Sequence, residues 1–168
     1  GGAVFYGGLL GGLAAGALYL RIRRLPFAAY ADIAAPAIPL FHAFGRIGCF
    51  LAGCCFGKPT DSIFGVVFPA GSAAPAGVPL WPVQLFSAAG DLLLAGTLLL
   101  LEKKRRGDGL LTGAYLLLYS VGRFLIEFLR ADPRGAVGIF STSQFIALFA
   151  AAAAAVILLL RKRGTSHE

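Results

Sequence analysis

The sequence predicts an all-α protein, a polytopic membrane helical bundle with about five transmembrane helices. Hydrophobic residues make up 58% of the 168 residues and charged residues only 14%, whereas a water-soluble domain usually carries about 25% charged residues. Several apolar stretches approach the roughly 20 residues that a helix needs to cross a bilayer. Short basic clusters follow three of these stretches. The chain therefore has too little polar surface for water, and we expect the lipid bilayer to surround it.

The expected spans are long runs of apolar residues separated by charges, glycines or prolines. They cover about Ala3–Leu20, Phe27–Phe44, Val83–Leu101, Leu110–Leu129 and Ser143–Leu160. In the first span, Gly8, Gly12 and Gly16 recur every four residues, which places small residues on one face for close helix packing. In the second, Pro36 and Pro39 are expected to kink or break the helix. We expect residues 1–168 to form a single transmembrane domain.

The basic clusters predict the orientation of the spans. Ten of the fifteen Lys and Arg residues lie in residues 21–24, 103–106 and 161–163, and such clusters mark loops on the cytoplasmic side. The start of the chain and residues 45–81 and 131–141 are then outside. The net charge of +7 does not indicate nucleic acid as a partner, because no basic face interleaved with aromatic residues is present.

The beginning of the chain has the character of an internal segment. It starts with Gly-Gly, lacks Met throughout and shows no charged region, apolar core and cleavage site of a signal peptide. We expect this sequence to be a fragment of a longer protein with further spans upstream.

The fourth span carries polar side chains that are costly in lipid. Tyr119, Arg123, Glu127 and Arg130 are spaced by four, four and three residues, so they share one helical face. Charged residues inside spans are functional candidates by default, and this stripe has a net positive charge that suits an anion. The alternative is a self-satisfied Arg123–Glu127 pair with Arg130 reaching the interface.

A second polar group surrounds Arg46 at the outer end of the second span. Glycines flank Arg46 on both sides, at positions 45, 48, 53 and 57, and we expect a bend that lets a ligand approach the backbone. A guanidinium there can hold a phosphate through two parallel hydrogen bonds. Two arginine sites near the same leaflet suggest a phosphorylated, lipid-soluble substrate. His42, one turn earlier, is either a general base or a structural hydrogen-bonding residue.

The remaining unusual residues leave several interpretations open. Asp32 is expected to face either the bundle interior or the inner interface, and the same two alternatives are open for Asp91 in the third span. Cys49, Cys54 and Cys55 form a C-x4-C-C pattern that is not the spacing of a recognised zinc site. Buried packing ranks first for these thiols, then a disulfide from Cys49, and then catalysis or metal binding. We expect no metal and no cofactor.

Several segments together resemble the prolipoprotein diacylglyceryl transferase family. The similarity extends over nearly the whole chain and rests on five stretches, Ala31–Leu40, Gly45–Gly57, Pro82–Leu85, Gly122–Arg130 and Gly138–Gln144. The second of them resembles the family signature, the third its Pro-x-Gln-Leu motif and the fourth its charged stripe. The family has seven spans with an outside N-terminus, so removal of two spans leaves the arrangement that the basic clusters predict.

The resemblance implies a specific reaction and specific residues. Such enzymes transfer diacylglycerol from phosphatidylglycerol to the lipobox Cys thiol of a prolipoprotein in the bacterial cytoplasmic (inner) membrane, and glycerol phosphate leaves. Arg46 and Arg123 match the family's essential arginines, and Glu127 would orient Arg123. With His42 these form the expected catalytic set. The expected substrate-binding residues are Tyr6, Gly45, Gly48, Gly57, Gln84, Tyr119 and Arg130.

The chain departs from the family pattern at polar positions. Tyr6 replaces a His, Cys49 an Asn and Cys54 an acidic residue, and Trp81, Phe86 and Ser87 replace the residues around Gln84. These departures leave two alternatives to the transferase, namely a non-catalytic paralogue and a protein that binds or transports an anionic lipid.

Overall fold

The computed structural model describes residues 2–103, 109–131, 136–137 and 140–164, and it is built almost entirely from helices. The expectation of an all-α membrane bundle is confirmed. Its elements are α1 (Gly2–Ile22), α2 (Phe27–Ala34), α3 (Ala37–Leu51), α4 (Val83–Glu102), α5 (Leu110–Ile126), the 3-10 turn η1 (Glu127–Leu129), β1 (Ala136–Val137), β2 (Phe140–Ser141) and α6 (Thr142–Gly164). The two strands form only a small antiparallel hairpin before α6.

Four segments of the described chain are long and apolar enough to cross a membrane. They are Phe27–Leu51, Val83–Glu102, Leu110–Leu129 and Thr142–Leu160, which correspond to the second to fifth predicted spans. Helix α1 covers the predicted first span. Large side chains on these helices point away from the protein, with Leu100 65% exposed and Leu159 63% exposed. Such surfaces require an apolar solvent, so the chain is a multi-pass membrane protein.

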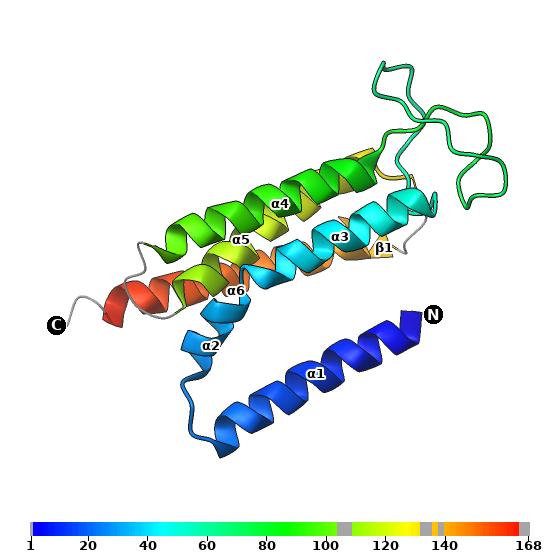
Figure 1. Cartoon of the computed structure of the whole chain (residues 1–168). Helices are drawn as coiled ribbons and strands as arrows, with labels where there is room; N and C mark the ends of the chain where they lie inside the picture. Colours follow the sequence, from blue (N-terminus) through cyan, green and yellow to red (C-terminus); the bar gives the residue numbers. More distant parts are fainter. Residues whose placement is uncertain (1, 104–108, 132–135, 138–139, 165–168) are drawn as a thin grey trace.

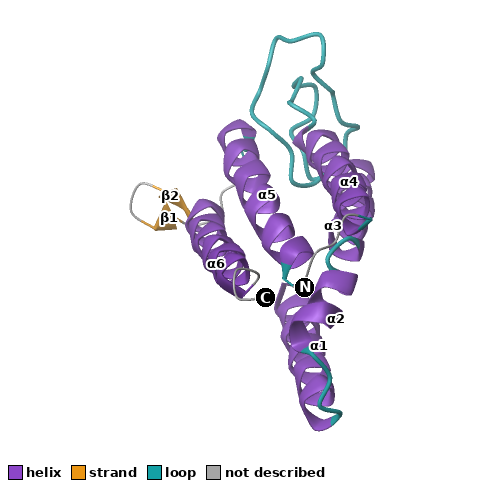
Figure 2. Cartoon of the chain, turned by 90° about the vertical axis from the view of Figure 1, so that its left-hand side faces the viewer, coloured by secondary structure: helices purple, strands orange, loops and turns teal. Residues whose placement is uncertain are grey.

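Helices α3, α4, α5 and α6 pack side by side in chain order (Figure 1). The core of this bundle lies between α4 and α5, where Leu94, Leu98, Leu111 and Tyr115 are buried with Ala35. Helix α1 lies beyond α2, apart from α4 and α6 (Figures 1 and 2). A side-chain carbon added at Gly12 or Gly16 would meet nothing within 4 Å. The predicted small-residue face therefore makes no close helix contact within the described chain.

The predicted alternation of the spans fits the arrangement of the helices. The long loop between α3 and α4 lies at one end of the bundle, and the C-terminal ends of α4 and α6 lie at the other (Figure 1). Residues 45–81, which are predicted to be outside, meet the end of the fourth span, because Lys58 N donates to Leu129 O at 2.8 Å and Gly57 pairs with Arg130. Ala131 N, at the start of the other segment predicted outside, donates to Phe56 O at 3.5 Å. Residues 104–106 lie outside the described residues, as do the side chains of residues 161–163.

The second span breaks where the prolines predict a break, and it differs from the prediction at its end. The helix breaks at Pro36, as expected, between α2 and α3, while Pro39 sits in the first turn of α3, where a missing N–H costs no hydrogen bond. The predicted bend around Arg46 is wrong, because α3 continues through Gly45 and Gly48 to Leu51. An isolated glycine costs a helix only about 1 kcal/mol, which the surrounding apolar run outweighs.

Asp32 joins α2 to the start of α5. Its side chain is fully buried, Oδ2 accepts from Gly109 N at 2.9 Å, and Oδ1 accepts from Thr112 N at 2.9 Å and Thr112 Oγ1 at 2.7 Å. The first N–H groups of a helix have no partner within the helix. Asp32 therefore caps α5 from a distant part of the chain, at the end opposite the long loop.

The loop between α3 and α4 returns to the bundle through Gly57. A side-chain carbon at Gly57 would lie 2.6 Å from Trp81 O and 2.8 Å from Val83 Cγ1. Gly57 N donates to Trp81 O at 3.0 Å, and Trp81 N donates to Lys58 O at 3.0 Å. Only glycine fits this close backbone approach, which brings the start and the end of the loop together.

Substitution of Asp32 by Ala is expected to destabilise the bundle. Two backbone N–H groups and a hydroxyl would lose their acceptor, which we expect to lower the free energy of unfolding by about 2 kcal/mol. For a chain of this size that corresponds to a melting temperature lower by about 4–8 °C, measurable by thermal unfolding in detergent. Asp61→Asn, in the exposed part of the loop, is the control. Equal melting temperatures for both variants would contradict the capping role.

Gly57→Ala is expected to destabilise the loop, whereas Gly45→Ala should not. The added methyl at Gly57 collides with backbone, and forced overpacking costs about 1–3 kcal/mol. A methyl at Gly45 meets nothing within 4 Å in the chain and favours the helix. Limited proteolysis of the loop checks the difference. Equal resistance of Gly57→Ala and the unchanged protein would show that the close approach is not required.

Candidate functional site

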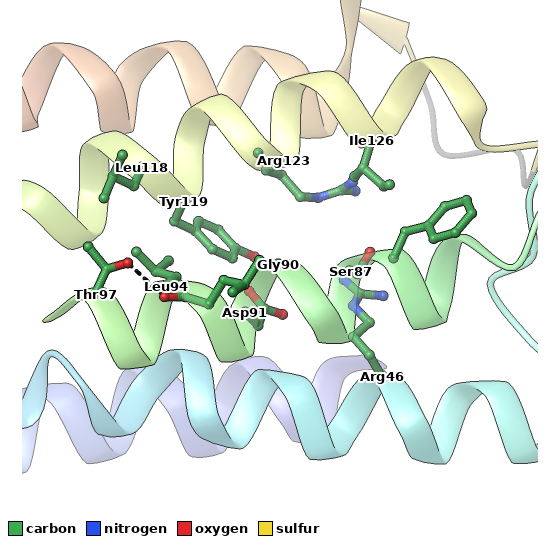
Figure 3. A pocket seen from close by; sticks show the side chains of 13 residues that line it. Arg46, Ser87, Gly90, Asp91, Leu94, Thr97, Leu118, Tyr119, Arg123 and Ile126 are labelled. Atoms are coloured by element: carbon green, nitrogen blue, oxygen red, sulfur yellow. Dashed lines mark hydrogen bonds between the residues drawn. The ribbon is translucent and has the colours of Figure 1, made fainter. Parts of the chain in front are cut away.

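A cavity of about 290 Å³ lies within the bundle, between α3, α4 and α5. Most of its wall is apolar, and its polar groups come from three helices (Figure 3). The lining residues are Arg46, Phe86, Ser87, Gly90, Asp91, Leu93, Leu94, Thr97, Leu118, Tyr119, Gly122, Arg123 and Ile126. A mostly apolar pocket with a few convergent polar groups is the usual form of a ligand site.

Arg46 and Arg123 line this cavity together. They are 77 positions apart in the sequence, on α3 and α5, and both side chains reach into the space between these helices (Figure 3). Two guanidinium groups so placed repel each other unless an anion is nearby. Their convergence, which the sequence predicts, makes the cavity a candidate anion site.

Arg123 is held by two neighbours. Its Nη1 lies 2.7 Å from Glu127 Oε2, and its Nη2 donates to Ser143 Oγ at 2.9 Å. The side chains of Arg123 and Glu127 are only 11% and 8% exposed. Glu127 is in η1 and does not line the cavity. It thus stands behind Arg123, where it offsets the cost of burying the cation and fixes its direction.

Asp91 is the acidic residue of the cavity wall. It is 8% exposed on α4 and lies within electrostatic range of both Arg46 and Arg123. In the sequence, a charge in the middle of a span marks Asp91 as a functional candidate. The sequence does not show which charged residues lie near it. Tyr119, from the predicted stripe, also lines the cavity.

His42 lies next to the cavity rather than in its wall. Its ring centroid is 5.4 Å from that of Tyr119, with the rings tilted by 43°. Its buried Nδ1 accepts or donates no hydrogen bond within the described chain. The imidazole therefore packs against Tyr119, a residue of the cavity wall, and does not itself line the cavity.

The other predicted binding residues lie outside the cavity wall. Gln84 is buried, and its Nε2 donates to Cys54 O at 2.7 Å. Gly57 and Arg130 pair at the end of the bundle that carries the long loop. Gly45 and Gly48 lie on an exposed part of α3. Tyr6 is in α1, and its side chain lies outside the described residues.

Sequence reasoning missed several residues that shape the site. Gly90 and Gly122 lack side chains where α4 and α5 face the cavity, and Ser87 adds a hydroxyl. Ser143 was noted only as the start of the last span. The family-like turn before α6 is a reciprocal cap, because Gln144 N donates to Ser141 Oγ and Ser141 N to Gln144 Oε1, both at 3.1 Å.

The three cysteines come together at the end of α3, with Cys49 in its last turn and Cys54 and Cys55 in the loop that follows. None is in a disulfide, and their sulfur atoms all lie within 4.8 Å of one another, so they are the group in the described chain that is able to hold a metal ion. Burial, and then hydrogen bonding to the Cys49 and Cys55 thiols, raises the pKa of Cys54 to about 11. A thiol with this pKa is almost wholly protonated at neutral pH, which disfavours Cys54 as an unaided nucleophile.

Comparison with known proteins agrees with the sequence motifs. The family described as prolipoprotein diacylglyceryl transferase matches residues 1–160. A Clostridium perfringens protein named phosphatidylglycerol–prolipoprotein diacylglyceryl transferase 2 is 48% identical over 88% of this chain and 58% of its own length. Proteins named phosphatidylglycerol–prolipoprotein diacylglyceryl transferase from Clostridium tetani and Idiomarina loihiensis are 45% and 39% identical.

The chain spans less than two thirds of these relatives, 59% of the Clostridium tetani protein and 52% of the Idiomarina loihiensis protein. The same two alignments include 88% and 84% of this chain. With the family match over residues 1–160, this extent of similarity shows that the chain belongs to the prolipoprotein diacylglyceryl transferase family.

Proposed function

We propose that this protein transfers diacylglycerol from phosphatidylglycerol to the lipobox Cys thiol of a prolipoprotein, releasing glycerol phosphate, in the bacterial inner membrane. The observation that supports this most is the shared cavity of Arg46 and Arg123, between membrane spans. Relatives that carry this activity in their names match most of the chain. The substrate's phosphate would bind between the two guanidinium groups, with its acyl chains along the apolar wall.

In the proposed reaction, negative charge builds up on the phosphate. The acceptor sulfur forms a bond to the glyceryl carbon while the bond from that carbon to the phosphate oxygen breaks, so negative charge grows on the departing phosphate. Fixed donors that meet a growing charge stabilise the transition state more than the substrate. Arg123, already fixed by Glu127 and Ser143, is preorganised for this role, and Arg46 would complete the site from α3.

Asp91 gives the cavity a charge balance suited to a lipid phosphodiester. Without ligand, its carboxylate lies near both arginines and reduces their repulsion. The wall still carries two cations and one anion, which favours a ligand with a single negative charge. The proton of the acceptor thiol would leave through a group at this wall or through water, and Asp91 is better placed for this than His42.

Arg46→Ala and Arg123→Ala are each expected to reduce transfer by about 100-fold or more, since loss of one fixed donor to a developing oxyanion costs about 10²–10³ in rate. The measurement is transfer of labelled diacylglycerol from phosphatidylglycerol to a lipobox peptide, using the full-length protein. Arg23→Ala, at the opposite end of the bundle, is the matched control. Turnover in both cavity variants at the control's rate would refute the proposed phosphate site.

Glu127→Gln is expected to act only through Arg123. Loss of the charge that directs the guanidinium should lower kcat about 10-fold, and the effect should vanish when Arg123 is already Ala. A double-mutant cycle with the same transfer assay measures this coupling, and Glu127→Asp should recover part of the loss. Additive effects of the two substitutions would instead show that Glu127 acts independently of Arg123.

A further inference from the structure

The most unusual feature outside the cavity is the group of three thiols at the outer end of α3. Cys49 lies in the last turn of α3, and Cys54 and Cys55 follow in the loop. All three side chains are half-buried, and each pair of sulfur atoms is within 4.8 Å. Three soft ligands, from the end of a helix and the loop that follows it, thus lie in one place.

The backbone around the cluster is fixed by several independent contacts. Cys54 N donates to Cys49 O at 3.0 Å, and Gln84, from α4, donates to Cys54 O at 2.7 Å. Gly53 has φ +65° and Cys55 has φ +60°. A left-handed conformation costs a non-glycine residue about 1–3 kcal/mol and persists where the surroundings require it. Here it turns the chain so that the Cys55 sulfur joins the other two.

The separation of the sulfur atoms matches the requirements of a metal ion. Zinc binds thiolate sulfur at about 2.3 Å, which places two sulfur ligands about 3.8–4.0 Å apart. A cluster within 4.8 Å reaches this geometry by small side-chain rotations. In the described chain, no fourth His, Cys, Asp or Glu joins the group. Three protein ligands with one open position are typical of reactive rather than structural zinc sites.

We propose that Cys49, Cys54 and Cys55 form a three-thiolate site for a soft metal ion of the zinc class, with the fourth position open to an external thiol. The C-x4-C-C spacing does not match a known zinc-binding motif. Its three residues come instead from the end of a helix and a left-handed turn, so the sequence pattern alone does not indicate the site. Thiolates prefer such soft ions over the oxygen-seeking Mg²⁺ and Ca²⁺.

The site lies close to the cavity, so the open coordination position could bind the substrate thiol. This role rests on the proposed function. Cys49 is three residues after Arg46 on α3, so the thiols lie about one turn from the cavity's phosphate-binding end. A substrate thiol that coordinates the ion releases its proton to water, and its sulfur is then a thiolate at neutral pH. That sulfur then forms the bond to the glyceryl carbon, and glycerol phosphate leaves with the electron pair of the broken bond.

Metal binding is tested without lipid or transfer activity. The purified full chain, reduced and exchanged into buffer without thiols, is titrated with Zn²⁺ or Cd²⁺ against a coloured chelator. We expect one ion per chain, at least a 10-fold lower affinity for each single Cys→Ser variant, and no change for Asp61→Asn. The bound ion should also protect the thiols of the unchanged protein from alkylation. This measurement does not depend on whether the variants fold. Absence of protection, or affinity unaffected by the substitutions, would overturn the metal site, as would a disulfide that forms in its place.

The open position is tested with Co²⁺ as the probe. The visible spectrum of the Co²⁺-loaded protein should change when a lipobox peptide with Cys is added and should not change with the Ser peptide. Equal spectra with both peptides would overturn the external-thiol position. Because no phosphatidylglycerol is present, this result is independent of whether the protein transfers diacylglycerol.

Discussion

The burial of Arg123 is the constraint on which the arrangement of the bundle depends. A charged side chain inside a membrane span costs roughly 2.5–3.5 kcal/mol or more, and lipid offers it no hydrogen bond. Contacts with Glu127 in η1 and Ser143 in α6 offset this free energy of burial. The same contacts join the end of α5 to the start of α6, so the group that makes the cavity cationic also holds α6 against α5.

Contacts at the end of the bundle beside Glu127 extend this constraint to the long loop. Residues 56–58 pair with residues 129–131, directly after Glu127, and Gln84 ties Cys54 to α4. The thiol cluster, the arginine on α5 and the start of α4 are therefore parts of one connected network. At the opposite end, Asp32 caps α5. Helix α5 is thus anchored at both ends, which holds Tyr119 and Arg123 in place along the cavity.

The parts of the structure that the sequence predicts are those decided by composition and helical period. Span length follows from the apolar runs, and the common face of Tyr119 and Arg123 follows from a spacing of four. The Arg46 helix was mispredicted, because glycine content alone does not show whether a neighbouring apolar run carries the helix through. The partner of Asp32 and the meeting of the three thiols depend on contacts between distant segments or on a left-handed residue such as Cys55, which single-sequence patterns do not encode.

The composition of the cavity wall bears on what kind of anion fits it. Much of the lining consists of Leu93, Leu94, Leu118 and Ile126. A soluble phosphate would gain nothing from these side chains, and the water around it would leave them exposed at a cost in free energy. An amphiphile would use both parts, because its acyl chains would lie along the apolar wall while its phosphate would meet the arginines. The long apolar faces of α3 and α5, such as Phe44 at 65% and Leu125 at 60% exposed, require lipid around this region. A lipid ligand would therefore exchange one apolar environment for another, and the free energy that distinguishes bound from unbound states would come mainly from its headgroup.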